Sequence, residues 1–248
     1  MNPIWKNIPE LSTAVFISAT SASDSAGGAN WYWYERVPLD STAPHDGNGV
    51  VAASGDIVSI AAGSGNLVNA SGATISVAAN LSVDIVGGGD TVTGGSGSRI
   101  RIGGNGPAGA SNTVNASSST VELVDASRAT VNGNGNTVIL GRDDVLVLGG
   151  TGNTVDAGAE DRIWLASAAE TIAFHADFGH GALNGFTAAG AALDVIQFDR
   201  NVFADWQRVL AGTSQSGADT LITSVAGDVL TLANTTSTAL TAANFRFV

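Results

Sequence analysis

Residues 51–172 repeat in units of eight or nine residues, and this repeat restricts the fold more than any other feature of the chain. Asn-Thr-Val occurs at 112–114, 136–138 and 153–155, and Asp-Thr-Val occurs at 90–92. Each unit holds a short run of β-forming residues between Gly, Asn or Ser, and a unit this short cannot bury a face alone. Stacked units share one continuous core, so we expect a solenoid.

The predicted fold class is all-β: a parallel β-solenoid, as a two-sheet β-roll or a three-sided β-helix, with a β-sandwich as the less favoured alternative. Two units per coil would give on the order of six coils. Gly makes up 32 of 248 residues and charged residues 13%, a composition that suits tight turns between short strands. Asn side chains at equivalent positions of successive coils would form an amide ladder.

Three zones divide the chain. Residues 1–50 hold three of the five Trp and are predicted to form an aromatic N-terminal cap. Residues 51–172 form the solenoid, and residues 173–248 form an α+β C-terminal cap. Both caps are expected because the open ends of a solenoid would otherwise template aggregation.

The C-terminal cap has three predicted elements. A strand covers 194–198, and a helix follows across 202–210, capped by Asp199 or Asn201 and ended by Gly212. A hairpin pairs 219–224 with 228–233.

Two glycine-rich segments, Gly94-Gly-Ser-Gly97 and Gly103-Gly-Asn-Gly106, begin nine residues apart. They resemble the RTX repeat, Gly-Gly-x-Gly-x-Asp-x-apolar-x, in a degenerate form, because Arg99 and Arg101 replace its Asp and its apolar residue. The resemblance implies a β-roll with calcium between its coils. We predict one or two Ca²⁺ ions, held by acids among Asp90, Asp143, Asp144, Asp156 and Asp161. The alternative is a metal-free roll with exposed acids.

The segments Gly217-Ala-Asp-Thr220, Asp228-x-Leu-Thr-Leu232 and Asn244-Phe-Arg-Phe247 follow in the order seen in the C-terminal region of serralysin-like proteins. In that family the region caps the β-roll and carries a type I export signal. The resemblance implies a secreted, extracellular protein whose partner during secretion is a type I exporter. The His-Glu-x-x-His zinc helix of the family's protease domain is missing, so proteolysis is not implied.

The formal charge of −12 and the absence of Cys exclude several classes of function. Nucleic acid is not an expected partner, because no basic patch would neutralise its phosphates. Disulfides and thiolate sites are excluded. Residues 1–20 lack a basic region followed by a long apolar stretch, so export without a Sec-type leader is expected. No run reaches the roughly 20 apolar residues of a membrane span, so membrane insertion is not expected.

Aromatic residues are densest in Trp31-Tyr-Trp-Tyr34. In a strand, Trp31 and Trp33 would share one face. Trp31, Trp33 and Tyr34 are the candidate ligand-binding residues, as a sugar-stacking platform. The alternative is a plug on the open end of the solenoid.

The predicted function is that of a secreted, non-enzymatic module for surface adhesion, matrix or assembly. The alternative is an extracellular polysaccharide-binding or polysaccharide-modifying protein, such as a lyase-like or epimerase-like β-helix. No catalytic residues are assigned, because residues 51–172 contain no Lys, His or Tyr. A regular face of Thr, Ser and Asn would favour the first function. A pocket with Trp31, Tyr34 and paired carboxylates would favour the second.

Overall fold

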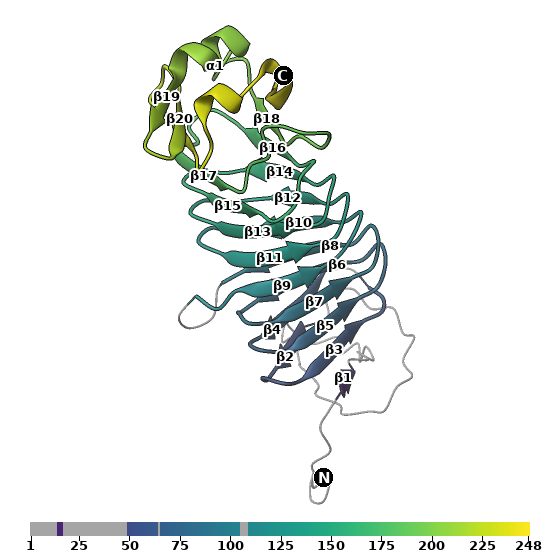
Figure 1. Ribbon diagram of the computed structural model, residues 1–248. Helices are drawn as coiled ribbons and strands as arrows, with labels where there is room; N and C mark the ends of the chain where they lie inside the picture. Colours follow the sequence, from purple (N-terminus) through teal and green to yellow (C-terminus); the bar gives the residue numbers. More distant parts are fainter. Residues whose placement is uncertain (1–13, 17–48, 64, 105–108) are drawn as a thin grey trace, which may run out of the picture.

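The structure, a computed structural model, describes residues 14–16, 49–63, 65–104 and 109–248. The part described forms two long sheets that run the length of an elongated stack (Figure 1). Sheet A contains, in spatial order, β1 (Ala14–Phe16), β3 (Ile57–Ile60), β5 (Thr74–Val77), β7 (Thr91–Gly94), β9 (Asn112–Asn115), β11 (Arg128–Asn132), β13 (Val145–Gly149), β15 (Arg162–Leu165), β17 (His180–Asn184), β21 (Val229–Leu232), β20 (Asp219–Thr223) and β19 (Thr213–Ser216). Sheet B contains β2 (Gly49–Ala52), β4 (Asn66–Ala70), β6 (Ser82–Val86), β8 (Arg99–Gly103), β10 (Thr120–Leu123), β12 (Thr137–Ile139), β14 (Thr154–Ala157), β16 (Thr171–Phe174), β18 (Val195–Phe198) and β22 (Phe245–Phe247).

The chain alternates between the two sheets, so each coil adds one strand to each. Equivalent residues of successive coils are 17 apart along most of the stack, as in Thr74 and Thr91. Strands of successive coils pair in parallel, and antiparallel pairing joins only β19, β20 and β21 among the described strands. The predicted all-β parallel solenoid is confirmed, in its two-sheet form.

Inward-facing aliphatic residues fill the space between the sheets. One column of sheet A is fully or almost fully buried in every coil: Val58, Ile75, Val92, Val114, Val131, Leu148 and Leu165. A matching column of sheet B contains Val83, Ile100, Val121, Val138, Val155, Ile172 and Ile196. Each Val of an Asn-Thr-Val unit points inward, because side chains alternate between the faces of a strand.

The turns bring the coils close together. Gly133 has φ +127°, and a Cβ placed on it would lie 1.7 Å from the carbonyl oxygen of Ala116. Glycine is required there, since any side chain would push the coils apart. Buried turn side chains then complete the hydrogen bonding between coils. The Oδ1 of Asn136 accepts from Ser119 N at 3.1 Å, and that of Asn153 accepts from Asn136 N at 2.8 Å. Asn side chains thus recur at equivalent positions of successive coils, as predicted, but at these positions they bond to backbone groups and not to one another.

The two sheets continue past residue 172, because β17, β18, β21 and β22 pair in parallel with the strands before them. Aromatic rings replace aliphatic side chains in this part of the core, with the centroids of Phe198 and Phe203 4.7 Å apart. Helix α1 (Trp206–Gly212), the 3₁₀ turns η1 (Ser237–Ala239) and η2 (Ala242–Asn244) and the predicted hairpin lie at this end of the stack (Figure 1).

The predicted cap of this helix was wrong. Asp205, not Asp199 or Asn201, caps α1, and its Oδ1 accepts from Arg208 N at 3.0 Å. The backbone carbonyl oxygen of Asp199 instead accepts a hydrogen bond from the N–H group of Val202, which closes the turn before the helix. The carboxylate of Asp199 faces His175, which directly follows β16.

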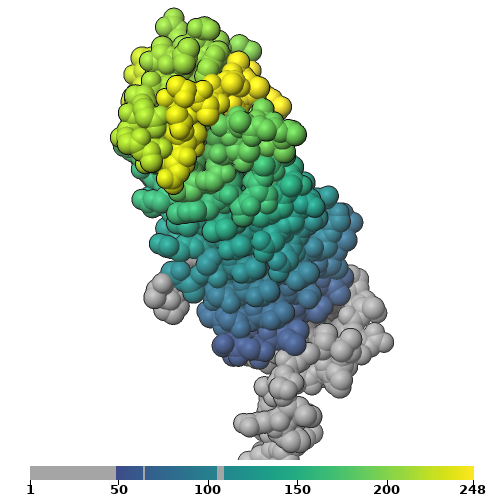
Figure 2. Space-filling view, viewed as in Figure 1, coloured from purple at the N-terminus to yellow at the C-terminus, as the bar shows by residue number. Residues whose placement is uncertain are grey.

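The space-filling view shows the same elongated column, with the C-terminal residues gathered over one end (Figure 2). No helix within the part of the chain described is long and apolar enough to cross a membrane. The predicted aromatic N-terminal cap lies almost wholly outside the described residues.

Candidate functional site

The outward face of sheet A carries two parallel columns of small polar side chains. The Thr column contains Thr74, Thr91, Thr113 and Thr130. The Ser/Asn column, two residues further along each strand, contains Ser59, Ser76, Thr93, Asn115 and Asn132. All nine side chains are exposed or half-buried. Neighbouring members of a column stand about 4.8 Å apart, the spacing of paired strands.

The repeat itself produces this array. In each strand the central residue is an inward Val or Ile, so the residues on either side of it point outward. β-Branched Thr favours the extended backbone and keeps a restricted χ1 rotamer, so its hydroxyl has a defined direction. The buried ladder holds successive coils in one register. A periodic array of hydroxyl and amide groups therefore results.

Most of the polar groups in the two columns are unused by the protein. The Thr column makes no side-chain hydrogen bond within the part of the chain described, whereas Asn132 Nδ2 donates to Asn115 Oδ1 at 3.0 Å. These hydroxyl groups are available to water or to a ligand.

A shallow hollow of about 420 Å³ lies beside the Ser/Asn column. Its lining consists of small and polar residues: Gly94, Ser96, Asn115, Ala116, Ser117, Asn132 and Gly133. Two of the lining residues, Gly94 and Gly133, have no side chain that could fill the hollow.

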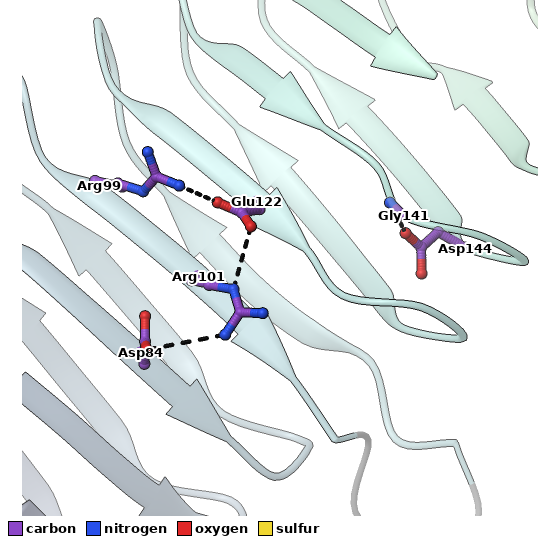
Figure 3. Close-up of polar contacts among 6 residues, drawn as sticks. All are labelled: Asp84, Arg99, Arg101, Glu122, Gly141 and Asp144. Carbon is purple, nitrogen blue, oxygen red and sulfur yellow. Dashed lines mark hydrogen bonds and ion pairs between the residues drawn. The ribbon is translucent and has the colours of Figure 1, made fainter. Parts of the chain in front are cut away.

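Charge is distributed unevenly between the two sheets. The outward side chains of β3, β5, β7 and β9 are all uncharged. Sheet B carries an ion-pair network (Figure 3) in which Glu122 binds Arg99 and also accepts from Arg101 Nε at 3.1 Å, and Arg101 Nη1 lies 3.9 Å from Asp84 Oδ2. The acidic residues that give the chain its net charge of −12 therefore lie outside these four strands of sheet A.

Three of the predicted calcium ligands, Asp90, Asp144 and Asp161, are buried in turns and accept hydrogen bonds from backbone N–H groups. Asp161 accepts from Asp144 N at 2.8 Å and from Gly158 N at 2.7 Å. Asp144 accepts from Ser127 N at 2.7 Å and from Gly141 N at 2.6 Å (Figure 3).

In Asp90 only Oδ1 is bonded in this way, accepting from Ala73 N at 2.8 Å, and Oδ2 is buried without a hydrogen-bond partner among the described residues. Burial raises the pKa of Asp161 to about 7 and that of Asp144 to about 6, and it also raises the pKa of Asp90. Desolvation disfavours the charged form more than the backbone bonds favour it.

The other two predicted ligands, Asp143 and Asp156, lie apart from these. Asp143 is exposed in a turn at φ 58°. Asp156 faces outward from β14, where its Oδ1 lies 2.7 Å from His175 Nε2. Nδ1 of the same ring lies 3.0 Å from Asp199 Oδ2, and this bond is the main reason that the pKa of His175 is raised.

The structure brings Asp144 next to Asp161 but does not gather the five predicted acids at one site. Within the described ranges, no three His, Asp or Glu side chains are placed to hold a metal ion. The candidate ligand-binding residues Trp31, Trp33 and Tyr34 lie outside the described residues.

Two buried acids, Glu170 and Asp194, were not predicted as site residues. Glu170 Oε2 accepts from Asn153 N at 2.7 Å, and Asp194 Oδ1 accepts from Glu170 N at 2.9 Å, so both continue the Asn ladder. Burial raises the pKa of Glu170 to about 7 and raises that of Asp194. The sequence carried a signal, because Glu170-Thr-Ile repeats the Asn153-Thr-Val pattern one coil later.

Comparison of the chain with protein-family models, curated proteins and solved structures finds no match.

Proposed function

We propose that this protein is a secreted, RTX-related, non-enzymatic module that attaches to an extracellular surface through the two polar columns of sheet A. The observation that carries the proposal is the regular array of uncharged hydroxyl and amide groups on β3, β5, β7, β9 and β11. A periodic array matches a periodic partner, because each added coil repeats the same contacts. Many weak hydrogen bonds then sum to a strong attachment.

The lack of charged outward side chains on β3, β5, β7 and β9 also favours a neutral partner. Burying a charged side chain against a neutral solid carries a large desolvation penalty, whereas hydroxyl groups exchange water for ligand oxygens at little net penalty. Neutral, ordered polymers and ice have such surfaces. Localisation outside the cell and passage through a type I exporter remain proposals that rest on the C-terminal resemblance.

The proposal is tested with a bulky double substitution, Thr91→Tyr with Thr113→Tyr, in the centre of the Thr column. We expect the wild-type chain to deplete from solution onto microcrystalline cellulose, chitin or polycrystalline ice. The variant should lose most of this adsorption, because two rings would hold the surface away from the other hydroxyl groups.

A matched control exists on sheet B, where Thr137 and Thr154 occupy neighbouring outward positions. The pair Thr137→Tyr with Thr154→Tyr should adsorb like the wild type. Thermal unfolding of both variants checks that the stack is intact. Equal loss of adsorption in the two variants, or no adsorption by the wild type to any of the three solids, would contradict the proposal.

A further inference from the structure

An aromatic side chain, Trp164, lies on the outward face of sheet A beyond the end of the Thr column. It is 39% exposed, although large aromatic side chains are normally buried. Its neighbours on β15, Ile163 and Leu165, already fill the core. Trp164 is therefore not needed for packing between the sheets, and it makes no ring-to-ring contact within the described residues.

The surroundings of Trp164 leave its ring accessible. Val147 lies opposite on β13 and is 36% exposed, and Asn184 lies opposite on β17. The next outward positions on the neighbouring strands are Gly149 and Ala182, whose side chains are too small to cover the indole. An apolar platform thus has an amide group at its edge, a combination suited to a sugar ring, which presents C–H groups on its face and hydroxyl groups at its rim.

A positively charged side chain, that of Arg162, lies beside this platform. Arg162 precedes Trp164 by two residues on the same strand and points to the same face, at a backbone separation of about 7 Å. It forms no ion pair with any carboxylate in the part of the chain described. The adjacent acid, Asp161, is buried and accepts hydrogen bonds from two backbone N–H groups. Oε1 of the next acid, Glu160, lies 3.5 Å from Nδ1 of His180.

The charge on this part of the sheet has one sign. From β3 to β17, the strands of sheet A carry Arg128 and Arg162 on their outward face and contain no Asp or Glu, in a chain of net charge −12. The planar guanidinium group binds carboxylates through two parallel hydrogen bonds. The local charge is complementary to an anionic ligand, not to a cationic one.

We propose that Trp164, Arg162 and Asn184 form a subsite for an acidic polysaccharide, in which a uronic acid ring stacks on the indole and its carboxylate pairs with the guanidinium group. Val147 extends the platform toward the neighbouring ring of the polymer. This subsite is separate from the two polar columns and does not depend on their proposed function.

The test measures the retardation of the full chain in native gels that contain polygalacturonate. Gels with its carboxyl-reduced, neutral form and gels with polyglutamate, a polyanion without sugar rings, run in parallel. We expect retardation by polygalacturonate alone. Trp164→Ala should abolish it, and Arg162→Gln should weaken the apparent affinity roughly tenfold, the effect of losing one charge-assisted pair.

The matched control is Arg99→Gln, an arginine on the outward face of sheet B that is already paired with Glu122. It should bind polygalacturonate like the wild type. The Thr91→Tyr, Thr113→Tyr variant should also bind it, so that failure of the subsite and failure of the polar columns are told apart. The inference is overturned if the wild type is not retarded, if polyglutamate retards it equally, or if Trp164→Ala behaves like the wild type.

Discussion

At the scale of the residue, the polar side chain that begins each Asn-Thr-Val or Asp-Thr-Val unit has one recurring task. Asn112, Asn136 and Asn153, like Asp90, each accept a hydrogen bond from a backbone N–H group of the coil before. Asn136 also donates from Nδ2 to the carbonyl oxygen of Ala116 at 2.8 Å. The side chain therefore satisfies two backbone groups that the sheets leave unpaired in the turn.

Asn136→Ala should lower the free energy of unfolding by about 1–3 kcal/mol, because it leaves a buried N–H group and a buried carbonyl without partners. Asn69→Ala, a change at an exposed position of β4, is the control and should alter it by less than about 0.5 kcal/mol. Urea unfolding followed by circular dichroism measures both values. Similar values for the two variants would show that the ladder contributes little to stability.

At the scale of the element, buried acids lie in the turns that lead into the strands of both sheets. The pKa values of Asp144, Asp161 and Glu170 are raised by burial to about 6, 7 and 7. In the unfolded chain these groups titrate near pH 4. Between about pH 4 and pH 7 the folded state therefore binds more protons than the unfolded state, so stability is lost as the pH rises through this range.

The protein should be more stable at pH 5 than at pH 7.5 in thermal unfolding. Glu170→Gln should reduce the difference in the free energy of unfolding between pH 5 and pH 7.5 by on the order of 1–3 kcal/mol. The reason is that an amide can accept the hydrogen bond from Asn153 N without carrying a charge. Asn153 shows that the ladder accommodates an amide. His175, whose pKa is also raised, contributes in the same direction and remains in the variant. Stability that rises toward pH 7.5 would contradict the prediction.

At the scale of the whole molecule, the stack is held by its core, its ladders and its sheets. Asp144 and Asp161 each accept two backbone N–H groups. Their oxygens thus have partners in the folded chain without a metal ion, whereas calcium needs six or more oxygen ligands. The stack is therefore expected to fold without bound calcium.

The melting temperature in EDTA should lie within a few degrees of that in millimolar calcium. The physical reason is that the buried carboxylates already contribute their hydrogen bonds in the apo chain. Differential scanning calorimetry, with circular dichroism of the EDTA sample, provides the measurement. A chain that is unfolded in EDTA and folds on addition of calcium would contradict this expectation and would support the acids predicted as ligands.

The sequence by itself determined the period, the strand positions and the direction of most side chains. In Asn-Thr-Val the Val must point inward and the Thr outward, because side chains alternate along a strand and only the apolar one is stable in the core. The regular face of sheet A follows from this rule and from repetition. The inward or outward direction of these side chains depends only on the order of residues within each strand.

The tertiary structure alone decided which residues of different coils stand together. Asp156 and Asp161 are five residues apart and look alike in sequence, yet Asp156 faces outward beside His175 while Asp161 is buried beneath Asp144. Their environments differ because the turn between β14 and β15 reverses the chain, and the 17-residue coil then sets which backbone groups lie opposite each carboxylate. Burial, pKa and pairing depend on that stacking, which local pattern does not contain.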